Sequence, residues 1–342
     1  MILYYKCPSC GSDMTFDPKS GELICDSCGR IENIESYPEE LKQAEFSPEE
    51  TKEYQCENCG AVLITTADTV ATHCSFCGAG VVIGDRVSGH LAPKRVIPFT
   101  ITKEEAIQAF KKWCRKGLLT PKGFMTADRI QSITGMYIPF WLFDLNSKVQ
   151  VSAICTREST YEEGDYICTE TEFYEAFRDI NLNYVKIPAD ASEKMDDELM
   201  DRLEPFSYDQ LKEFKTPYLV GYLAEKYNYT DEELLPRVKG KINEYIEAYI
   251  SSTFRGYHSV DYRQKQIETN NVKSFYVLLP VWMVNYDYNN KVYTFAMNGE
   301  TGKVVGFPPL SKGKMAAWFG GIAAGTLLAF KCVALLMGGG FL

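Results

Sequence analysis

Eight of the twelve cysteines lie before residue 78, in four short motifs of the form CxxCG that we call knuckles. The pairs are Cys7 and Cys10, Cys25 and Cys28, Cys56 and Cys59, and Cys74 and Cys77. Fourteen residues separate the first knuckle from the second, and fourteen separate the third from the fourth, so one unit occurs twice. Two residues between cysteines let a tight turn bring both sulfurs to one ion, and the following glycine permits a positive φ. Because four thiolates close a tetrahedral shell, the sequence predicts two structural Zn²⁺ ions.

Each unit also carries the short strands of a zinc ribbon. In the first unit, Met14–Phe16 and Glu22–Ile24 flank the turn sequence DPKSG. In the second unit, Val62–Thr65 and Thr69–Thr72 flank another short turn. The pattern predicts one β-hairpin in each unit. Units this small have too little core to fold alone, so metal binding is expected to supply the folding free energy.

Two other uses of paired cysteines compete with zinc. A thioredoxin-like redox pair suits a single CxxC beside a βαβ pattern, and an iron–sulfur cluster usually has irregular cysteine spacing. Neither use explains why the same four-cysteine spacing occurs twice. The opening residues MILYYKCPSC lack the charged region and apolar run of a secretory signal. We therefore expect a cytosolic N-terminus, where thiols stay reduced.

Composition and charge exclude some classes of protein and make others less suitable as an explanation of this chain. The chain has 342 residues, and its aromatic content of 13% excludes a disordered chain. The net charge is −10, and the first 90 residues hold 6 basic and 15 acidic side chains. Such acidic ribbons would repel phosphate, so we expect them to bind protein and do not expect nucleic acid as a partner.

The chain divides into five predicted segments. They are zinc ribbon 1 (1–36), an acidic spacer (37–53), zinc ribbon 2 (54–90), an α+β body domain (91–310) and a C-terminal transmembrane segment (311–342). The predicted fold class is therefore α+β. It combines two small ribbons of short β-hairpins, a body made of an antiparallel β-sheet plus helices, and a C-terminal transmembrane helix.

Periodicity and capping residues place the elements of the body. A strand is predicted over Arg95–Ile101, and the capping box Thr102–Glu105 opens a helix that continues to Lys116. A second capped helix is predicted from Thr230 through Ile250, with an apolar stripe that we expect to be core. The stripe consists of Leu234, Val238, Ile242, Tyr245, Ile246 and Tyr249. Further predicted elements are a strand over Ile167–Ile187 and helices over Glu193–Leu203, Tyr208–Phe214 and Tyr218–Tyr227.

Two aromatic segments of the body resemble each other and suggest an internal duplication. Ile138–Phe143 reads IPFWLF, and Leu279–Val284 reads LPVWMV. A hairpin signal follows each segment, with a turn at Asn146-Ser147 in the first copy and at Asn289-Asn290 in the second. The body is therefore predicted to contain two related β-hairpins.

No catalytic motif is found in the sequence. The residues GETGK have two residues between Gly299 and Gly302 where a phosphate loop needs four, and Val304 follows where such a loop has Ser or Thr. We interpret them as a glycine-rich β-turn between strands Val292–Met297 and Lys303–Phe307. The chain has three histidines and no HExxH, GxSxG or GxGxxG pattern. We therefore expect that the protein is not an enzyme.

The C-terminal residues favour a membrane anchor. Ala316–Met337 covers 22 residues, about 33 Å of helix, which is enough to cross a bilayer. The one charge inside this span, Lys331, can extend its ammonium group toward the membrane surface. Lys312 and Lys314 precede the span, which predicts that the ribbons and body face the cytoplasm. We expect a single-pass protein of the cell membrane, held through residues 315–337.

The same residues resemble a family, the bacterial TFIIB-type zinc-ribbon-containing membrane proteins, which are often mislabelled as primosomal replication-restart helicases. The resemblance rests on CPSCG and its three partner knuckles, YIPFWLFDL, VKIPADASEKMDDELMDRLEPF followed by YLVGYLAEKYN, and LPVWMVNYDYNNKVYTFAMNGETGKVVG. It implies phage-shock-type and flotillin-like (SPFH) membrane proteins as partners, and a role in envelope stress or membrane scaffolding.

Three hypotheses for function follow. The first is a membrane-anchored cytoplasmic adaptor whose zinc ribbons bind a protein partner. The second is a nucleic-acid-binding replication or transcription factor that uses the zinc ribbons. The third is an enzyme with a polar cleft near Tyr137, Trp141 or Trp282, where we otherwise expect simple core.

Overall fold

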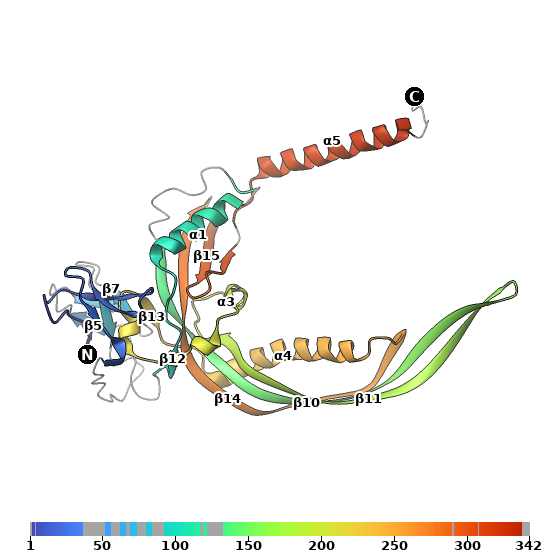
Figure 1. The fold of residues 1–342 in the computed structure, drawn as a ribbon, viewed down its shortest axis with the longest axis horizontal. Coiled ribbons are helices and arrows are strands. Elements are labelled where there is room, and N and C mark those ends of the chain that lie inside the picture. The colour runs from blue at the N-terminus through green and yellow to red at the C-terminus, as the bar shows by residue number, and fades with distance from the viewer. Residues whose placement is uncertain are drawn as a thin grey trace.

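The computed structural model describes residues 2–3, 5–36, 52–55, 62–65, 69–73, 80–83, 92–116, 119–121, 133–288, 291–306 and 308–336. Within these ranges the fold is α+β, with one eleven-stranded sheet, a three-stranded sheet near the N-terminus and a two-stranded ribbon. A curved β-structure and a single helix project from the body (Figure 1). The acidic spacer, apart from Lys52 and Glu53, and the third and fourth cysteine knuckles lie outside the described residues.

Three long strands form the curved projection. β10 (Thr134–Glu163) lies between β11 (Tyr166–Asp190) and β14 (Ser259–Tyr288) and is antiparallel to both. Strand β14 follows β10 only as far as Thr156, so the tip of the projection is a two-stranded hairpin. The long strand predicted over Ile167–Ile187 is confirmed as β11.

The predicted turn at Asn146-Ser147 is wrong. Asn146 and Ser147 lie inside β10, paired with residues of both neighbouring strands, and the chain turns instead between Glu163 and Tyr166, where Gly164 has a φ of +63°. The buried Ser147 hydroxyl meets that of Thr269 at 3.2 Å. Two flanking strands that satisfy the backbone of β10 on both sides therefore override the local turn preference of Asn-Ser.

The two similar aromatic segments lie side by side. Ile138 of β10 pairs with Leu279 of β14 in an antiparallel register. The second segment is followed by a hairpin, as predicted, because β14 pairs with β15 (Lys291–Asn298) up to Tyr288 and Lys291. The first segment has no hairpin at the corresponding place, so the structure does not show a repeated unit, and the duplication stays a prediction.

Helix α4 (Asp231–Thr253) lies along the inner side of the curve (Figure 1). The predicted capping box is confirmed, since the Glu233 amide donates to Thr230 Oγ1 at 3.3 Å and the Thr230 amide donates to Glu233 Oε2 at 2.7 Å. Five apolar side chains are buried, at Leu234, Val238, Ile242, Ile246 and Ile250. They pack on β10 and β11 as a core of their own. We refer to residues 143–191 and 231–274 as the β-arm.

Two residues of the predicted apolar stripe of α4 are not core. Tyr245 and Tyr249 are 61% and 48% exposed. Positions 242, 246 and 250 repeat every four residues along the buried face, and each tyrosine is one residue earlier, about 100° around the helix. Their aromatic rings therefore lie beside the stripe and face solvent.

The remaining elements of the body cover the other end of the sheet. Helix α1 (Lys103–Lys116) begins at the predicted capping box and packs Phe110 against Phe295, with ring centroids 4.3 Å apart. The glycine-rich turn predicted at GETGK is confirmed between β15 and β16 (Val304–Gly306), where Gly302 has a φ of +74°. The other elements are β9 (Arg95–Val96), α3 (Asp197–Leu203), the 3₁₀ turns Ile34–Ser36, Tyr208–Gln210 and Thr216–Leu219, β12 (Lys212–Glu213) and β13 (Leu223–Glu225).

Two predicted helices are wrong, and one strand is shorter than predicted. The predicted helix Tyr218–Tyr227 contains β13, which pairs in parallel with Met136 and Tyr137 of β10, and Gly221 ahead of it has a φ of +91°. The predicted helix Tyr208–Phe214 is one 3₁₀ turn followed by β12, and only Arg95 and Val96 of the strand predicted to Ile101 pair. The conformation of these segments depends on pairing with strands that are far away in the sequence.

The N-terminal strands confirm one predicted hairpin and contradict the other. β2 (Met14–Asp17) and β3 (Glu22–Cys25) form the first, extended by β4 (Ile31–Glu32). β6 (Val62–Thr65) instead pairs with β5 (Lys52–Gln55), and β7 (Thr69–His73) pairs with β8 (Gly80–Ile83) and with β13 of the body. β8 also pairs with β1 (Ile2–Leu3). The large sheet thus includes strands from the predicted second ribbon.

Candidate metal centre

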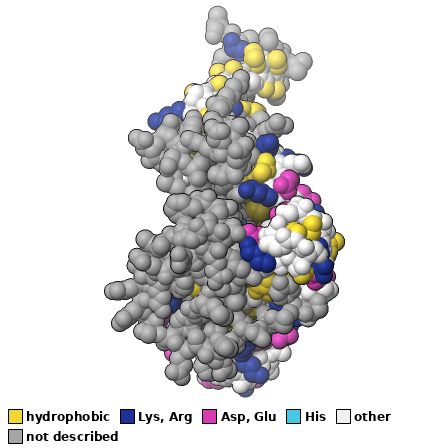
Figure 2. Space-filling view, turned by 90° about the vertical axis from the view of Figure 1, so that its left-hand side faces the viewer, with side chains coloured by type: hydrophobic (Ala, Val, Ile, Leu, Met, Phe, Trp, Pro, Cys, Tyr) yellow, Lys and Arg dark blue, Asp and Glu magenta, His cyan; other side chains and the backbone are white. Residues whose placement is uncertain are grey.

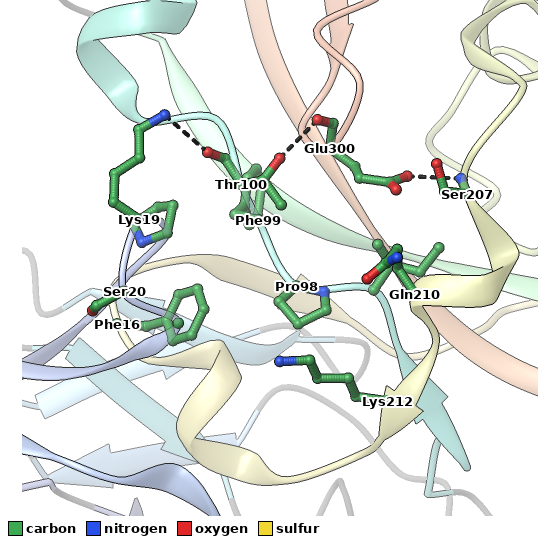
Figure 3. Close-up of a pocket in the computed structure, with 13 residues that line it drawn as sticks. Phe16, Lys19, Ser20, Pro98, Phe99, Thr100, Ser207, Gln210, Lys212 and Glu300 are labelled. Carbon is green, nitrogen blue, oxygen red and sulfur yellow. Dashed lines mark hydrogen bonds between the residues drawn. The ribbon is translucent and has the colours of Figure 1, made fainter.

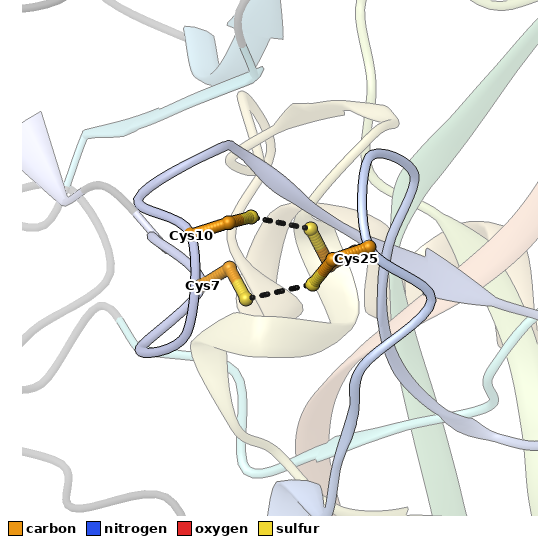
Figure 4. A group of neighbouring side chains, drawn as sticks. Cys7, Cys10 and Cys25 are labelled. Atoms are coloured by element: carbon orange, nitrogen blue, oxygen red, sulfur yellow. Dashed lines mark hydrogen bonds between the residues drawn. The ribbon is translucent and has the colours of Figure 1, made fainter.

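Four cysteines of the first unit converge on one point. Any two of the sulfur atoms of Cys7, Cys10, Cys25 and Cys28 lie within 4.8 Å of each other. Cys7 Sγ is 3.5 Å from Cys28 Sγ, and Cys10 Sγ is 3.5 Å from Cys25 Sγ. Figure 4 shows the labelled side chains pointing toward one another. Zinc–sulfur bonds of about 2.3 Å in a tetrahedron place sulfurs about 3.8 Å apart, so this arrangement fits Zn²⁺.

The two knuckles have the same backbone conformation. The Gly11 amide donates to the Cys7 carbonyl at 2.8 Å, and the Gly29 amide donates to the Cys25 carbonyl at 2.9 Å. Both glycines have a φ of +73°. Because a side chain is strained in that region, the glycine after each CxxC has the conformational role that the sequence predicts.

The four thiols shift one another's pKa values because they lie so close together. Hydrogen bonds from the side chain and backbone of Ser12 lower the pKa of Cys10 to about 6. The backbone of Arg30 acts to lower the pKa of Cys28, but hydrogen bonds with the other three cysteines outweigh it and raise that pKa to about 12. Burial acts to raise the pKa of Cys7, but hydrogen bonds from the backbone of Cys10 and Ser9 lower it. A divalent ion at the centre would let all four sulfurs ionise together.

The metal centre is docked on the body. Cys7 and Cys25 are buried, whereas Cys10 and Cys28 are exposed, so one side of the centre faces the protein and the other faces solvent. Phe16 packs edge-on against Tyr218 with ring centroids 5.5 Å apart, and its amide donates to the Val220 carbonyl. Ribbon and body share one hydrophobic core.

The basic side chains of the described ribbon are already paired. Lys6 contacts Asp13, Lys19 contacts Glu105 of α1 at 2.7 Å, and Arg30 contacts Glu32. These are the Lys and Arg residues of positions 5–36.

The other predicted zinc ligands cannot be placed. Cys56, Cys59, Cys74 and Cys77 lie outside the described residues. Within the described ranges, the cysteines that lie close enough together to hold a metal ion are the four of the first two knuckles.

Tyr137, Trp141 and Trp282, the residues named for a polar cleft, each bond a distant part of the chain. Tyr137 is fully buried, and its hydroxyl accepts a hydrogen bond from the Phe99 amide at 3.4 Å. The indole N–H groups of Trp141 and Trp282 donate to the carbonyls of Tyr229 and Ile101, each at 3.0 Å. All three side chains hold distant segments together, which is the core role that the sequence favours.

A cleft of about 430 Å³ lies between the ribbon and the body. Figure 3 shows Phe16 and Lys19 from the ribbon on one side and Glu300 on the other. The Glu300 carboxylate accepts the Ser207 amide at 2.8 Å, and the Lys19 ammonium donates to the Thr100 carbonyl at 3.3 Å. These charged groups brace the walls of the cleft and do not pair as an acid and a base.

Helix α5 (Lys312–Leu336) is the second candidate for function. In the described part of the chain it is the helix whose length and composition would let it cross a membrane. None of its apolar window is buried, and Phe319 and Phe330 are 78% and 75% exposed. Seen from the side of the ribbon, hydrophobic side chains gather at the top of the molecule, over α5 (Figure 2).

Sequence reasoning missed the surface on which the ribbon docks. Tyr218, Tyr222 and Val220 form it, in a segment predicted as helix. The high aromatic content of that segment was its one visible signal, and nothing in the sequence linked it to the ribbon.

Comparison with known proteins agrees with the metal centre. A family model described as TFIIB zinc-binding matches residues 5–46, which include the first two knuckles. A protein of Bacillus subtilis (strain 168), named "Uncharacterized protein YdjG", is 70% identical over 341 residues, and the match covers 100% of both chains. No solved structure gives a significant match. The chain therefore carries a TFIIB-type zinc ribbon and belongs to the same family as YdjG.

Proposed function

We propose that the protein is a membrane-anchored cytoplasmic adaptor with no enzyme activity of its own. Helix α5 inserts into the bilayer, the body acts as a rigid connector, and the zinc ribbons bind a protein partner. The observation that carries this proposal is α5 itself, an apolar helix that leaves the body and points away from the ribbon (Figure 1).

The exposed surface of α5 supports insertion into lipid. Large apolar side chains are exposed all around it, at Trp318, Phe319, Ile322, Leu327, Leu328, Phe330 and Val333. Soluble monomers rarely expose contiguous apolar patches of this kind, because water then contacts surface that burial would stabilise. The Trp318 ring lies close to the start of the helix, where aromatic rings suit the membrane interface.

The link between the two ends of the molecule supports an adaptor. Lys19 of the ribbon contacts Glu105 in the first turn of α1, and Thr120, just after α1, accepts a hydrogen bond from Lys314 in the first turn of α5. One helix, about 20 Å long, therefore connects the metal centre with the anchor. A partner bound to the ribbon would be held at a fixed distance from the membrane.

The charges of the ribbon favour a protein as the partner. Its cations are paired, and Ile31 is 58% exposed on its surface. The family resemblance adds phage-shock-type and SPFH membrane proteins as candidate partners, and envelope stress or membrane scaffolding as the process. We further propose that Cys56, Cys59, Cys74 and Cys77 hold a second zinc ion, because their spacing repeats that of the first set.

The test compares the full chain with a variant that ends at Ser311, both expressed in a bacterial host and fractionated. The full chain should resist carbonate extraction from membranes, and the shortened chain should be soluble with an unchanged zinc content. A shortened chain that stays with membranes would contradict the anchor. Copurification of the full chain in mild detergent should recover a protein partner, whereas steeply salt-dependent DNA binding would favour the nucleic-acid hypothesis.

A further inference from the structure

The segment just after α1 contacts the start of α5. The Trp113 ring lies so close to Gly306, at the end of β16, that a Cβ atom there would be 3.2 Å from it. Beyond α1, the Leu119 carbonyl accepts the Ser311 amide at 2.7 Å, and the Thr120 carbonyl accepts the Lys314 ammonium at 2.6 Å. These contacts place the end of α1 where α5 leaves the body.

Lys312 and Lys314 stand at the wrong end of α5 for helix stability. The N-terminus of a helix carries partial positive charge, so cations there are unfavourable by about 0.3–1 kcal/mol each. Lys314 is half-buried and uses the Thr120 carbonyl, but Lys312 is exposed and forms no salt bridge within the described part of the chain. A negatively charged group bound at this place would offset that cost.

Helix α1 carries two further exposed cations. Lys111 and Lys112 are exposed on the side of α1 away from the buried Phe110, and neither forms a salt bridge with a described residue. The sequence has no acidic residue between Glu105 and Asp128, and none after Glu300. In a chain whose net charge is −10, the two sequence segments that meet at this junction therefore carry basic side chains and no acidic ones.

We propose that Lys111, Lys112 and Lys312 form a site for the headgroups of anionic phospholipids, with Lys314 joining α5 to the segment that follows α1. This inference rests on the proposed insertion of α5. If α5 enters the bilayer at its first turn, these ammonium groups lie at the depth of the lipid phosphates, and the acyl chains lie along Trp318 and Phe319. Clusters of Lys and Arg at the cytoplasmic end of a membrane helix bind anionic lipid in this way.

A free phosphate ion is a poorer occupant. Isolated anions are often bound by the free amides of a helix N-terminus. In the first turn of α5, the amides of Lys314 and Met315 already donate to Ser311, at 3.4 and 2.9 Å. A lipid bilayer supplies many headgroups at once and is held in place by α5. The bilayer is therefore the source of negative charge that the patch fits.

The test uses the full chain in detergent micelles, with lipid retention measured by native mass spectrometry. Phosphatidylglycerol should be retained and phosphatidylcholine should not. The double variant K111Q/K112Q should weaken phosphatidylglycerol binding by about fivefold for each charge removed. The matched control is K103Q, which removes one exposed charge from the other end of α1, beside the ribbon, and should change lipid binding little.

Three results would overturn the proposal. They are equal retention of the two lipids, an equal effect of K103Q and K111Q/K112Q per charge, and displacement of phosphatidylglycerol by an equal concentration of inorganic phosphate. Carbonate extraction keeps the two proposals apart. If the full chain is extracted, the membrane anchor itself is wrong; if it stays in the membrane but shows no lipid preference, the headgroup site alone is wrong.

Discussion

Zinc ribbon 1 and the β-arm are stabilised in opposite ways. The described ribbon has short strands and no core of its own, since its buried side chains belong to the core of the body. The β-arm has strands of 25 and 30 residues and a separate core under α4. The ribbon therefore depends on four sulfurs and a docking surface, and the arm depends on ladder hydrogen bonds and apolar packing. One chain thus places a unit held by four sulfurs and a unit held by apolar packing in contact with the same body.

Loss of the metal ligands should give the largest difference in stability between the ribbon and the β-arm. The variant C7S/C25S removes two of the four sulfurs, and binding free energies of structural zinc ions are on the order of 10 kcal/mol or more. We expect one zinc ion fewer per chain and loss of hydrogen-exchange protection over residues 5–36, with protection of α4 unchanged. The matched control is C155A, which changes a buried cysteine of the arm that lies outside the metal centre and should leave zinc content intact. If loss of zinc also lowered the hydrogen-exchange protection of α4, the ribbon and the β-arm would not be stabilised independently.

Phe16→Ala should show how far docking contributes to the ribbon. The side chain is 4% exposed and lies against Tyr218 and Tyr222, so truncation should cost about 3–5 kcal/mol. We expect zinc to remain bound, since no sulfur is changed, while protection of the segment 215–222 falls. Zinc content by atomic absorption and hydrogen exchange measure the two effects. Complete loss of zinc would show that the metal cannot hold the ribbon without the body.

Ile246→Ala is the corresponding change in the arm. Ile246 is fully buried between α4 and the curved strands, so the cavity should cost about 2–5 kcal/mol. Hydrogen exchange should rise along α4, and zinc content should stay the same. Tyr245→Ala, one residue earlier and 61% exposed, is the control and should change stability little. If both variants destabilise the arm equally, the outer face of α4 is covered by something else.

Thr230→Ala should give the smallest effect. It removes the side chain that accepts the Glu233 amide at the start of α4, and such caps contribute about 0.5–2 kcal/mol. We expect a lower unfolding midpoint of the arm in urea and a normal metal centre. Thr230→Ser keeps the hydroxyl and should behave like the unchanged protein. A serine variant as unstable as the alanine variant would point to the methyl group of Thr230.

The features that sequence reasoning predicted correctly are local. The ligand set of Cys7, Cys10, Cys25 and Cys28 follows from the repeated spacing, and the capping boxes at Thr102 and Thr230 follow from residues three positions apart. The errors concern segments whose conformation depends on distant partners. Residues 223–225 became a strand because Met136 and Tyr137 of β10 lie beside them, and Asn146-Ser147 stayed extended between two neighbouring strands.

The sequence by itself determined where a zinc ion can bind, because the geometry of a tetrahedral site is set within two short turns. It also determined that residues 312–336 are apolar and long enough to cross a membrane, because length and composition decide that property. Only the tertiary structure decided that the ribbon docks on residues 215–222 and that residues 119–120, just after α1, contact the start of α5. Those contacts join residues about two hundred positions apart, and no local preference encodes which surfaces will meet.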